Sequence, residues 1–377
     1  MRAFSRLGLS GGPSDPMQQS VRLIKSPDGV TIAWASVGQG KPIVKAANWL
    51  AHLEYEWDSP VWRHWIRFFA DHFQLIRYDE RGCGMSDWDV GDVSPTRWSE
   101  DLETVIAAAK PEMPFTLLGI SQGAAAAITY AARYPERVAR LILYGAYALG
   151  WARRDDPHDR ELHEGIVELT RLGWGQDNPT FRQLFTSRFV PGATSEQIGW
   201  FNELCRKTTS PETAVKLMRA RSQVDVYDVL PQIQVPTLIV HARDDEAIPF
   251  SQARILAGEI PGARLVSLDS KNHILLEQEP AWQRFQEEVL AFMGESHRPS
   301  DVEDPIFASL SAREREILFE LTRGRTNAEI GRRLFISEKT VRNHITKIFE
   351  KLGVHSRAQA IVLTKDRGLR PTEPEPT

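Results

Sequence analysis

The chain has few cysteines and no long apolar run. Only two cysteines, Cys83 and Cys205, occur among 377 residues, and they lie far apart in the sequence. This usage predicts two free thiols in a reduced, cytoplasmic compartment and excludes a disulfide-rich secreted domain. Because no run of about 18 apolar residues is present, we expect no membrane-spanning helix.

The sequence also lacks motifs for binding a metal or a cofactor and for secretion. The histidines have no metal-ligand spacing around them, and the chain contains no glycine-rich phosphate-binding loop, so we expect no metal and no other cofactor. Residues 1–20 contain Gly and Pro but no apolar stretch of the length that a secretory signal needs. We predict a disordered leader there and a disordered tail at 371–377.

Charge is distributed unevenly, although the formal net charge is only -4. Residues 311–370 carry 14 Lys and Arg against 7 Asp and Glu, whereas the rest of the chain carries 32 against 43. A basic segment joined to an acidic body is typical of a nucleic-acid-binding module. Helix surfaces can also be basic by chance, so charge alone does not establish DNA binding. The sequence motif in residues 311–370 distinguishes the two interpretations.

Short apolar runs alternate with helical patterns over the first three quarters of the chain, which predicts an α/β fold with a mostly parallel, eight-stranded sheet. The expected strands are Val21–Lys25, Thr31–Val37, Pro42–Ala46, Gln74–Tyr78, Phe115–Gly119, Arg140–Tyr144, Thr237–His241 and Arg264–Leu268. Residues from about 148 to 224 interrupt this rhythm with helical periodicity and many aromatic side chains. We predict a helical lid there, inserted between two strands above a ligand pocket.

A serine stands between a predicted strand and an alanine-rich helix in the sequence Gly119-Ile-Ser121-Gln-Gly123. A sharp strand-to-helix turn exposes such a serine, and small residues beside it relieve the steric crowding of the turn. The pattern Gly-x-Ser-x-Gly is weak by itself, but the strand and helix around it supply the context that a nucleophile needs.

From about Val21 to Gly294 the chain resembles the α/β-hydrolase superfamily. Beside the serine motif, Arg77–Asp87 is similar to the superfamily's Asp-x-Arg-Gly-x-Gly-x-Ser loop, which is structural. The resemblance implies an acid and then a histidine after the serine. The segment 242–249 resembles the acid loop, with Asp245 favoured and Asp244 as the competing choice, and 270–273 resembles the histidine loop. Ser121, Asp245 and His273 would then be nucleophile, orienting acid and general base.

The oxyanion site departs from the superfamily pattern. Ala47-Asn48 stands where His-Gly is usual, so the donor amides would belong to Trp49 and to Gln122. A backbone amide needs no particular side chain, but the departure puts turnover in doubt. Asn48, Trp49 and His52 are candidate ligand-pocket residues, with simple loop packing under the lid as the alternative. Lys45 interrupts an apolar strand and either meets a ligand carboxylate or extends to solvent.

The last quarter of the chain follows a polar linker at 295–305 and contains four helix signatures within 306–370. A capping box of Ser311 with Glu314 begins the first helix, Ala312–Thr322. A second capping box, Thr326 with Glu329, begins the second helix, Asn327–Leu334. Ser337 caps a third helix, Glu338–Leu352, and Ser356 with Gln359 opens a fourth. A short second helix followed by a turn and a longer third helix has helix-turn-helix proportions.

This part of the chain resembles the LuxR-type (GerE-like) DNA-binding domain. The resemblance lies in the sequence and spacing of five segments: Leu310-Ser311, Asn327–Ile330, Leu334–Ser337, Thr340–His344 and Lys351–Val354. We expect the exposed face of the third helix to present Lys339, Arg342, Asn343, Thr346 and Lys347. Arg342 and Asn343 are candidates for base contacts, and Lys339 and Lys347 for phosphate contacts. Thr326 and Asn327 are candidates for binding phosphate through backbone amides. The resemblance implies a homodimer on a roughly palindromic site.

Two functions follow as expectations. The first is a transcription regulator that senses a small molecule in the α/β-hydrolase domain at 21–294, binds double-stranded DNA and acts on the transcription machinery. Slow hydrolysis of the ligand is compatible with this role. The alternative is a serine hydrolase acting on an ester, amide or lactone, with an accessory DNA-binding domain.

Overall fold

The computed structural model describes residues 19–178, 180–294, 307, 309–322, 325–334 and 336–367. The chain divides into two compact units, residues 1–295 (the first unit) and 296–377 (the second unit). Residues 1–18 of the predicted leader, the linker at 295–305 and the tail at 371–377 lie outside the described residues. Within the described part, no helix combines the length and apolar character that a membrane crossing requires.

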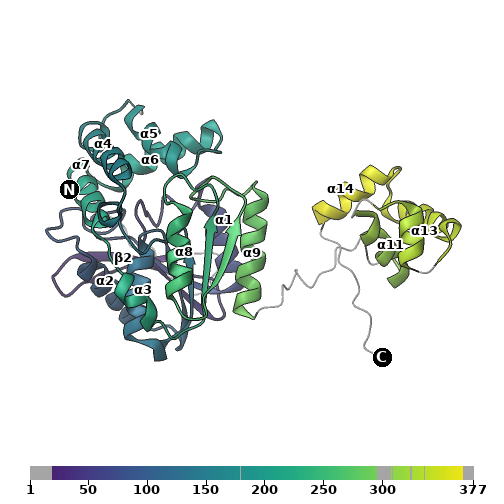
Figure 1. Cartoon of the computed structure of the whole chain (residues 1–377), viewed down its shortest axis with the longest axis horizontal. Coiled ribbons are helices and arrows are strands. Elements are labelled where there is room, and N and C mark those ends of the chain that lie inside the picture. Colours follow the sequence, from purple (N-terminus) through teal and green to yellow (C-terminus); the bar gives the residue numbers. More distant parts are fainter. Residues whose placement is uncertain are drawn as a thin grey trace, which may run out of the picture. The chain divides into compact units, whose positions relative to one another are not determined.

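The first unit is built on one eight-stranded sheet (Figure 1). Its strands are β1 (Ser20–Lys25), β2 (Thr31–Val37), β3 (Pro42–Ala46), β4 (Gln74–Tyr78), β5 (Phe115–Ile120), β6 (Val138–Tyr144), β7 (Thr237–Ala242) and β8 (Arg264–Leu268). Their order is β1-β2-β4-β3-β5-β6-β7-β8, with β2 antiparallel to both of its neighbours and β3 to β8 parallel.

All eight predicted strands are confirmed, with ends that differ by at most two residues. The central strands β5 and β7 are buried along their whole length, which explains their mostly apolar sequences. Strand β1 is an edge strand with mostly exposed side chains, and its polar residues face solvent. Apolar content therefore follows each strand's place in the sheet.

Helices cover both faces of the sheet. On one face, α1 (Arg63–His72) and α9 (Pro280–Met293) share a buried apolar cluster with β5 through Leu118. On the other face, α2 (Pro95–Ala109), α3 (Gly123–Arg133) and α8 (Phe250–Glu259) pack against Leu117 of the same strand. Because neighbouring strand residues point to opposite faces, a single apolar strand supplies both clusters.

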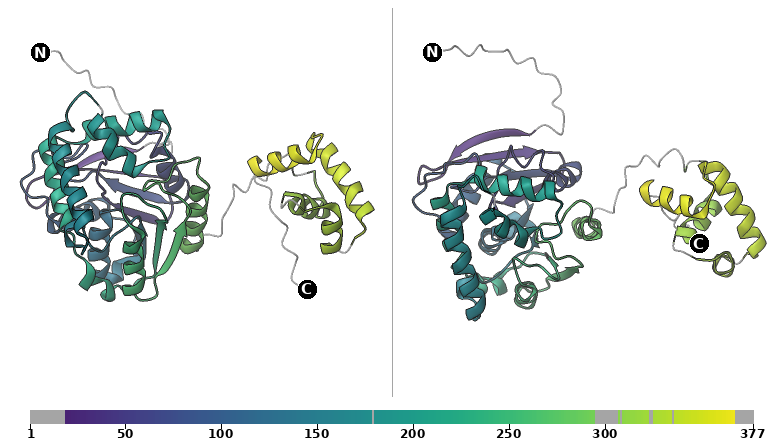
Figure 2. Two further views of the ribbon diagram at one scale, coloured as in Figure 1. Left: turned by 45° about the horizontal axis from the view of Figure 1, so that its top comes forward. Right: turned by 90° about the horizontal axis from the view of Figure 1, so that it is seen from above.

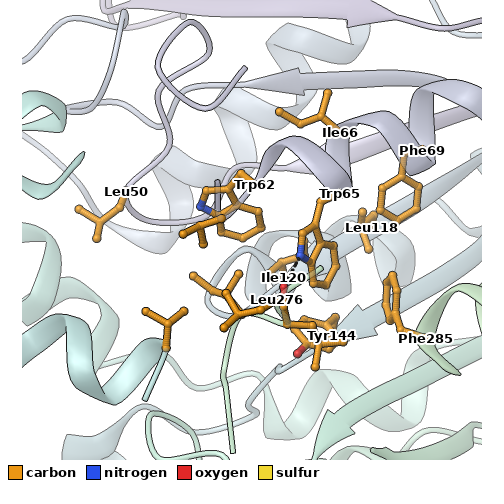
Figure 3. Packing of buried hydrophobic residues seen from close by; sticks show 14 of the residues in the cluster. Leu50, Trp62, Trp65, Ile66, Phe69, Leu118, Ile120, Tyr144, Leu276 and Phe285 are labelled. Atoms are coloured by element: carbon orange, nitrogen blue, oxygen red, sulfur yellow. Dashed lines mark hydrogen bonds between the residues drawn. The ribbon is translucent and has the colours of Figure 1, made fainter. Parts of the chain in front are cut away.

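An aromatic group on the α1 face connects the core to a functional loop. The Trp65 ring lies between Tyr144 and Phe285, with centroid distances of 5.0 and 4.7 Å (Figure 3). Its indole N–H donates to the carbonyl oxygen of Leu275 at 3.0 Å, and His64 Nε2 lies 3.0 Å from the same oxygen. The core therefore fixes the segment that directly follows His273.

Four helices occupy the interval for which we predicted a lid. They are α4 (Pro157–Gly173), α5 (Thr180–Phe189), α6 (Ser195–Thr208) and α7 (Pro211–Ser222), and they gather on one side of the first unit (Figure 2). The two ends of the insertion meet at its base, where the Gly150 amide donates to Val224 at 2.8 Å and the Val226 amide donates to Ala148 at 3.0 Å. The two segments that connect the lid to the rest of the unit are therefore hydrogen-bonded to each other.

Cys83 and Cys205 are both buried and unpaired, which confirms the two free thiols. Burial raises the pKa of each thiol well above its ordinary value. Both groups therefore stay protonated at neutral pH, and they behave as small packed side chains.

The second unit is a bundle of short helices: α11 (Ala312–Thr322), α12 (Asn327–Arg333), α13 (Glu338–Leu352) and α14 (Arg357–Arg367). The capping box at Thr326 and Glu329 is complete, and the Ser337 side chain accepts from the Thr340 amide at 3.1 Å. Ile330, Val341 and Ile348 are buried in the shared core. The predicted helices are confirmed, except that α12 ends one residue earlier than expected.

Candidate active site and DNA-binding surface

Ser121 lies at the turn between β5 and α3 with a φ of 52°, in the left-handed region that is costly for a residue with a side chain. The glycines on either side leave no space for a Cβ. One added at Gly119 would lie 2.6 Å from Cα of Ala124, and one added at Gly123 would lie 2.7 Å from the carbonyl oxygen of Ala47. The motif is therefore required by the close approach of α3 to the ends of β3 and β5.

Asp245 and His273 meet in the loops that follow β7 and β8. Asp245 Oδ2 lies 2.7 Å from His273 Nδ1, and Oδ1 accepts from the amides of Ala247 and Ile248 at 2.8 and 2.9 Å. Burial opposes ionisation of Asp245, but the neighbouring His273 and these hydrogen bonds outweigh it and lower the pKa of the carboxyl. Of the two acids weighed from the sequence, Asp244 is exposed and Asp245 contacts the histidine.

The other ring nitrogen of His273 is available for proton transfer. Nε2 is buried and has no hydrogen-bond partner among the described residues. The imidazole lies close to Gly145, where a Cβ would come within 2.8 Å of Cε1. The amides of His273 and Ile274 both donate to the carbonyl oxygen of Phe189, at 2.8 and 3.2 Å. Because Phe189 ends α5, the lid contacts the histidine loop through its backbone.

A chain of polar contacts holds the loop that carries Trp49. Lys45 is buried on β3, and its ammonium group donates to Asn48 Oδ1. Asn48 Nδ2 in turn donates to the Trp49 carbonyl oxygen at 3.1 Å, and Leu50 adopts a φ of 61°. Neither sequence-based reading of Lys45 is correct, because its side chain neither reaches solvent nor lines the cavity. It supports the Trp49 peptide instead.

A cavity of about 110 Å³ lies beneath the lid. Ser121, Gln122 and His273 line it together with Asn48 and Trp49, so these predicted site residues come together although they lie on loops after three different strands. Much of the remaining wall is aromatic or aliphatic and comes from the lid and from the residue before α1, and it includes Trp62, Trp151, Phe185, Phe189 and Phe201. The site is largely apolar, with polar groups at the serine and on the lid.

His52 does not belong to this cavity, contrary to the prediction from the sequence. It is not among the lining residues, and its Nδ1 accepts from the Tyr55 amide at 3.2 Å within its own loop. The chain turns away from the cavity after Ala51, so proximity in sequence to Trp49 was misleading.

Three arginines that were not predicted from the sequence line the cavity from the lid: Arg154, Arg188 and Arg221. Arg221 lies on α7 and places its guanidinium 4.6 Å from the centre of the Trp49 ring. No motif marks these residues, because polar side chains at scattered positions in amphipathic helices ordinarily face water. Only the packing of the lid on the sheet shows that they face inward.

The exposed face of α13 carries all five predicted DNA-contacting residues: Lys339, Arg342, Asn343, Thr346 and Lys347 are exposed. Val341 and Ile348 lie on the opposite, buried face of the same helix. Arg342 forms one ion pair, with Glu338 at 3.3 Å, between two largely exposed side chains. Such a surface pair is weak, so the guanidinium is free to exchange it for a base.

The N-terminus of α12 is less open than we expected. The Thr326 amide donates to the Glu329 carboxylate at 2.7 Å, and the Thr326 hydroxyl donates to the same carboxylate at 2.9 Å. This amide is therefore not available to a phosphate, and the carboxylate repels one. Asn327 stays a predicted phosphate contact, although its Oδ1 accepts from Arg357 at 3.4 Å.

Family models match both parts of the chain. The model for serine aminopeptidase, S33, matches residues 64–280, which is more than half of the chain. The model for bacterial regulatory proteins of the luxR family matches residues 308–364. The chain thus combines an α/β-hydrolase domain with a LuxR-type helix-turn-helix domain.

Individual proteins resemble one part or the other. The AB hydrolase superfamily protein YisY of Bacillus subtilis is 29% identical over 66% of this chain and 91% of its own length. The esterase EaEST of Exiguobacterium antarcticum is 28% identical, with a TM-score of 0.62, over 72% of this chain and 98% of its own. The transcriptional regulatory protein LiaR of Bacillus subtilis is 32% identical over 42% of this chain and 64% of its own length.

The turn at Ser121 makes a prediction about stability. Gly119→Ala places a Cβ against the backbone of Ala124, and we expect the free energy of unfolding to fall by roughly 1–3 kcal/mol. The matched control is Gly165→Ala in α4, where a Cβ meets nothing within 4 Å; it should leave stability unchanged or raise it slightly. Urea denaturation measures both variants. Equal effects of the two substitutions would contradict this account of the turn.

Lys45 makes a prediction about pH. Burial lowers the pKa of its ammonium group to about 8, so the unfolded chain binds this proton more tightly. Stability should therefore rise with pH between about 8 and 10.5, by on the order of 3 kcal/mol from this group. In Lys45→Met this component should disappear, whereas the exposed Lys271→Met should keep it. Urea denaturation at several pH values across this window checks it, and identical pH profiles of wild type and Lys45→Met would refute it.

Arg342 makes a prediction about DNA recognition. Arg342→Ala should weaken binding to a DNA site selected from a random pool by roughly 1–3 kcal/mol and relax one base preference. Arg342→Lys should retain most of the affinity for unrelated DNA but lose the same base preference, because lysine cannot bind guanine with two parallel hydrogen bonds. Fluorescence anisotropy with single-base variants of the site measures both effects. An unchanged base preference in Arg342→Ala would remove Arg342 from the base-contacting set.

Proposed function

The chain belongs to the serine aminopeptidase, S33, family of α/β hydrolases, and we propose that it is a DNA-binding transcription regulator that senses a small molecule in its hydrolase-fold unit. The observation that carries the proposal is the largely apolar cavity at Ser121 in a chain that also has a LuxR-type domain. An enzyme acting on freely diffusing substrates needs no DNA-binding domain. A regulator needs both a ligand site and a DNA site.

The lid is the element through which a ligand would act. It contributes Phe185, Phe189 and Arg221 to the cavity wall, and the Phe189 carbonyl accepts two hydrogen bonds from the histidine loop. A ligand that contacts these side chains favours the lid position in which they surround it. Differential affinity for two lid positions is the thermodynamic requirement for a ligand to change DNA binding.

The DNA side of the proposal is supported by the LuxR-type domain and by the exposed basic residues of α13. We propose that the chain binds double-stranded DNA as a homodimer, with one recognition helix in the major groove of each half-site. The ligand would change the fraction of dimer that is competent to bind, and the bound dimer would act on the transcription machinery.

A specific observation favours hydrolysis of the ligand as a second activity. The contact between Asp245 and His273 supports this activity, because it orients the imidazole and leaves Nε2, which has no partner among the described residues, open to a proton from a serine hydroxyl. Nε2 would take the proton of the Ser121 hydroxyl while its oxygen attacks an ester, amide or lactone carbonyl. Asp245 would stabilise the imidazolium that forms.

The remaining steps use groups that lie beside the serine. The backbone amides of Gln122 and Trp49 would donate to the oxyanion, and His273 would pass its proton to the leaving group. Water would then attack the acyl-serine ester, with Nε2 again taking the proton, and release a carboxylic acid. Hydrolysis of this kind would end the signal by consuming the ligand.

Covalent labelling tests the hydrolytic chemistry separately from regulation. Wild type should react with a fluorophosphonate, Ser121→Ala should not, and the exposed Ser187→Ala should react like wild type. In-gel fluorescence and intact mass measure the adduct. If wild type and Ser121→Ala are labelled equally, Ser121 is not an activated nucleophile.

Regulation is tested by the same variant in a reporter strain. Ser121→Ala keeps the cavity, so we expect it to retain control of its promoter if sensing requires binding alone. A variant that also carries Arg342→Ala should lose control in either case. If wild type shows no preference for any DNA sequence, the regulatory proposal fails and the hydrolase alternative remains.

A further inference from the structure

The cavity has an uneven distribution of charge. Among the described residues that line it, Arg154, Arg188 and Arg221 carry positive charge, and no Asp or Glu is present. Each of these arginines needs a partner, because buried charges are stable only when paired. A ligand carboxylate would be an additional partner wherever the protein leaves guanidinium hydrogen-bonding groups unused.

Two of the three arginines are already engaged by the protein. Arg154 pairs with Asp159 at 3.1 Å and donates through Nε to the Leu149 carbonyl oxygen. Arg188 donates to the Glu246 carbonyl oxygen at 3.1 Å. These contacts hold both side chains at the wall, so neither is the first choice for an unoccupied anion site.

Arg221 differs because most of its hydrogen-bonding capacity is unused. Nη2 pairs with the buried carboxylate of Glu80, which anchors the side chain. Nε and Nη1 are buried and have no hydrogen-bond partner in the part of the chain that the structure describes. The guanidinium also lies over the Trp49 ring, on the wall of the cavity that Ser121 lines. One carboxylate therefore positions the group and leaves it able to bind a second.

We propose that the cavity takes an organic anion, a molecule with an aliphatic or aromatic body and a carboxylate that pairs with Arg221. The aromatic wall accepts the body, and the guanidinium sets its orientation relative to Ser121. A charge-assisted hydrogen bond in a water-poor site discriminates strongly against a neutral analogue. The inference rests on the cavity being the ligand site of the proposed function, but it does not require turnover.

Direct binding measurements in the Ser121→Ala background test this assignment without interference from hydrolysis. The probes are 4-phenylbutyrate and the isosteric 4-phenylbutanamide, and isothermal titration calorimetry gives both affinities. We expect the carboxylate to bind about tenfold or more tightly than the amide. In Arg221→Gln the two affinities should become similar, mainly through loss of carboxylate binding.

Matched variants separate anion binding from folding. Arg219→Gln removes a charge from the same helix, where Arg219 pairs with Glu164 on the surface, and it should keep the full preference for the carboxylate. Because Arg221→Gln leaves Glu80 buried without its partner, Arg221→Gln with Glu80→Gln is measured as well, and thermal melting reports folding. The double variant should also lack the preference.

Three results would overturn the inference. The first is equal affinity of Ser121→Ala for the carboxylate and the amide. The second is an unchanged preference for the carboxylate in the folded double variant, and the third is that neither probe binds. Failure of the proposed hydrolysis has a different signature, because fluorophosphonate labelling would be absent while the carboxylate preference stays intact. Failure of regulation would appear only in the DNA measurements.

Discussion

The close approach of α3 to the ends of β3 and β5 is the constraint on which the site depends. At Gly119 and Gly123 the separation leaves no room for a side chain, and the chain between them has to turn sharply at Ser121. That turn directs the serine out of the sheet and brings the amide of Gln122 beside the loop that carries Trp49. Ser121 and the Gln122 amide are therefore positioned by backbone packing, and the contacts of Lys45 and Asn48 support the predicted donor at Trp49.

The lid contacts this rigid part through polar groups. The Phe189 carbonyl accepts from the histidine loop, and Arg221 pairs with Glu80 in the loop after β4 and lies over the Trp49 ring. Each contact links a lid helix to a loop that carries a predicted catalytic group. A shift of the lid would change the wall of the cavity and the support of His273 together, so sensing and catalysis would draw on the same contacts. In the proposed function, this coupling would let a ligand that moves the lid act on the site as well.

How well the site was predicted depended on whether a residue's role is local. Ser121 was identifiable because glycine spacing, the preceding strand and the following helix lie within a dozen residues of one another. The helices of the second unit were identifiable for the same reason, since capping boxes such as Thr326 with Glu329 determine a helix start from four residues. Lys45 and His52 were misread, because strand position and proximity in sequence do not determine which side chain faces a cavity.

The sequence by itself determined the eight strands, the four helices of the second unit and the division into acidic and basic parts, because these follow from local pattern and composition. The order of serine, acid and histidine was implied by the resemblance to the α/β-hydrolase superfamily. Only the tertiary structure decided that Asp245 rather than Asp244 contacts His273, that Lys45 supports the Trp49 loop, and that Arg221 faces inward. These outcomes depend on contacts between segments far apart in the chain, and helix periodicity is the same whether a charged residue meets water or a cavity.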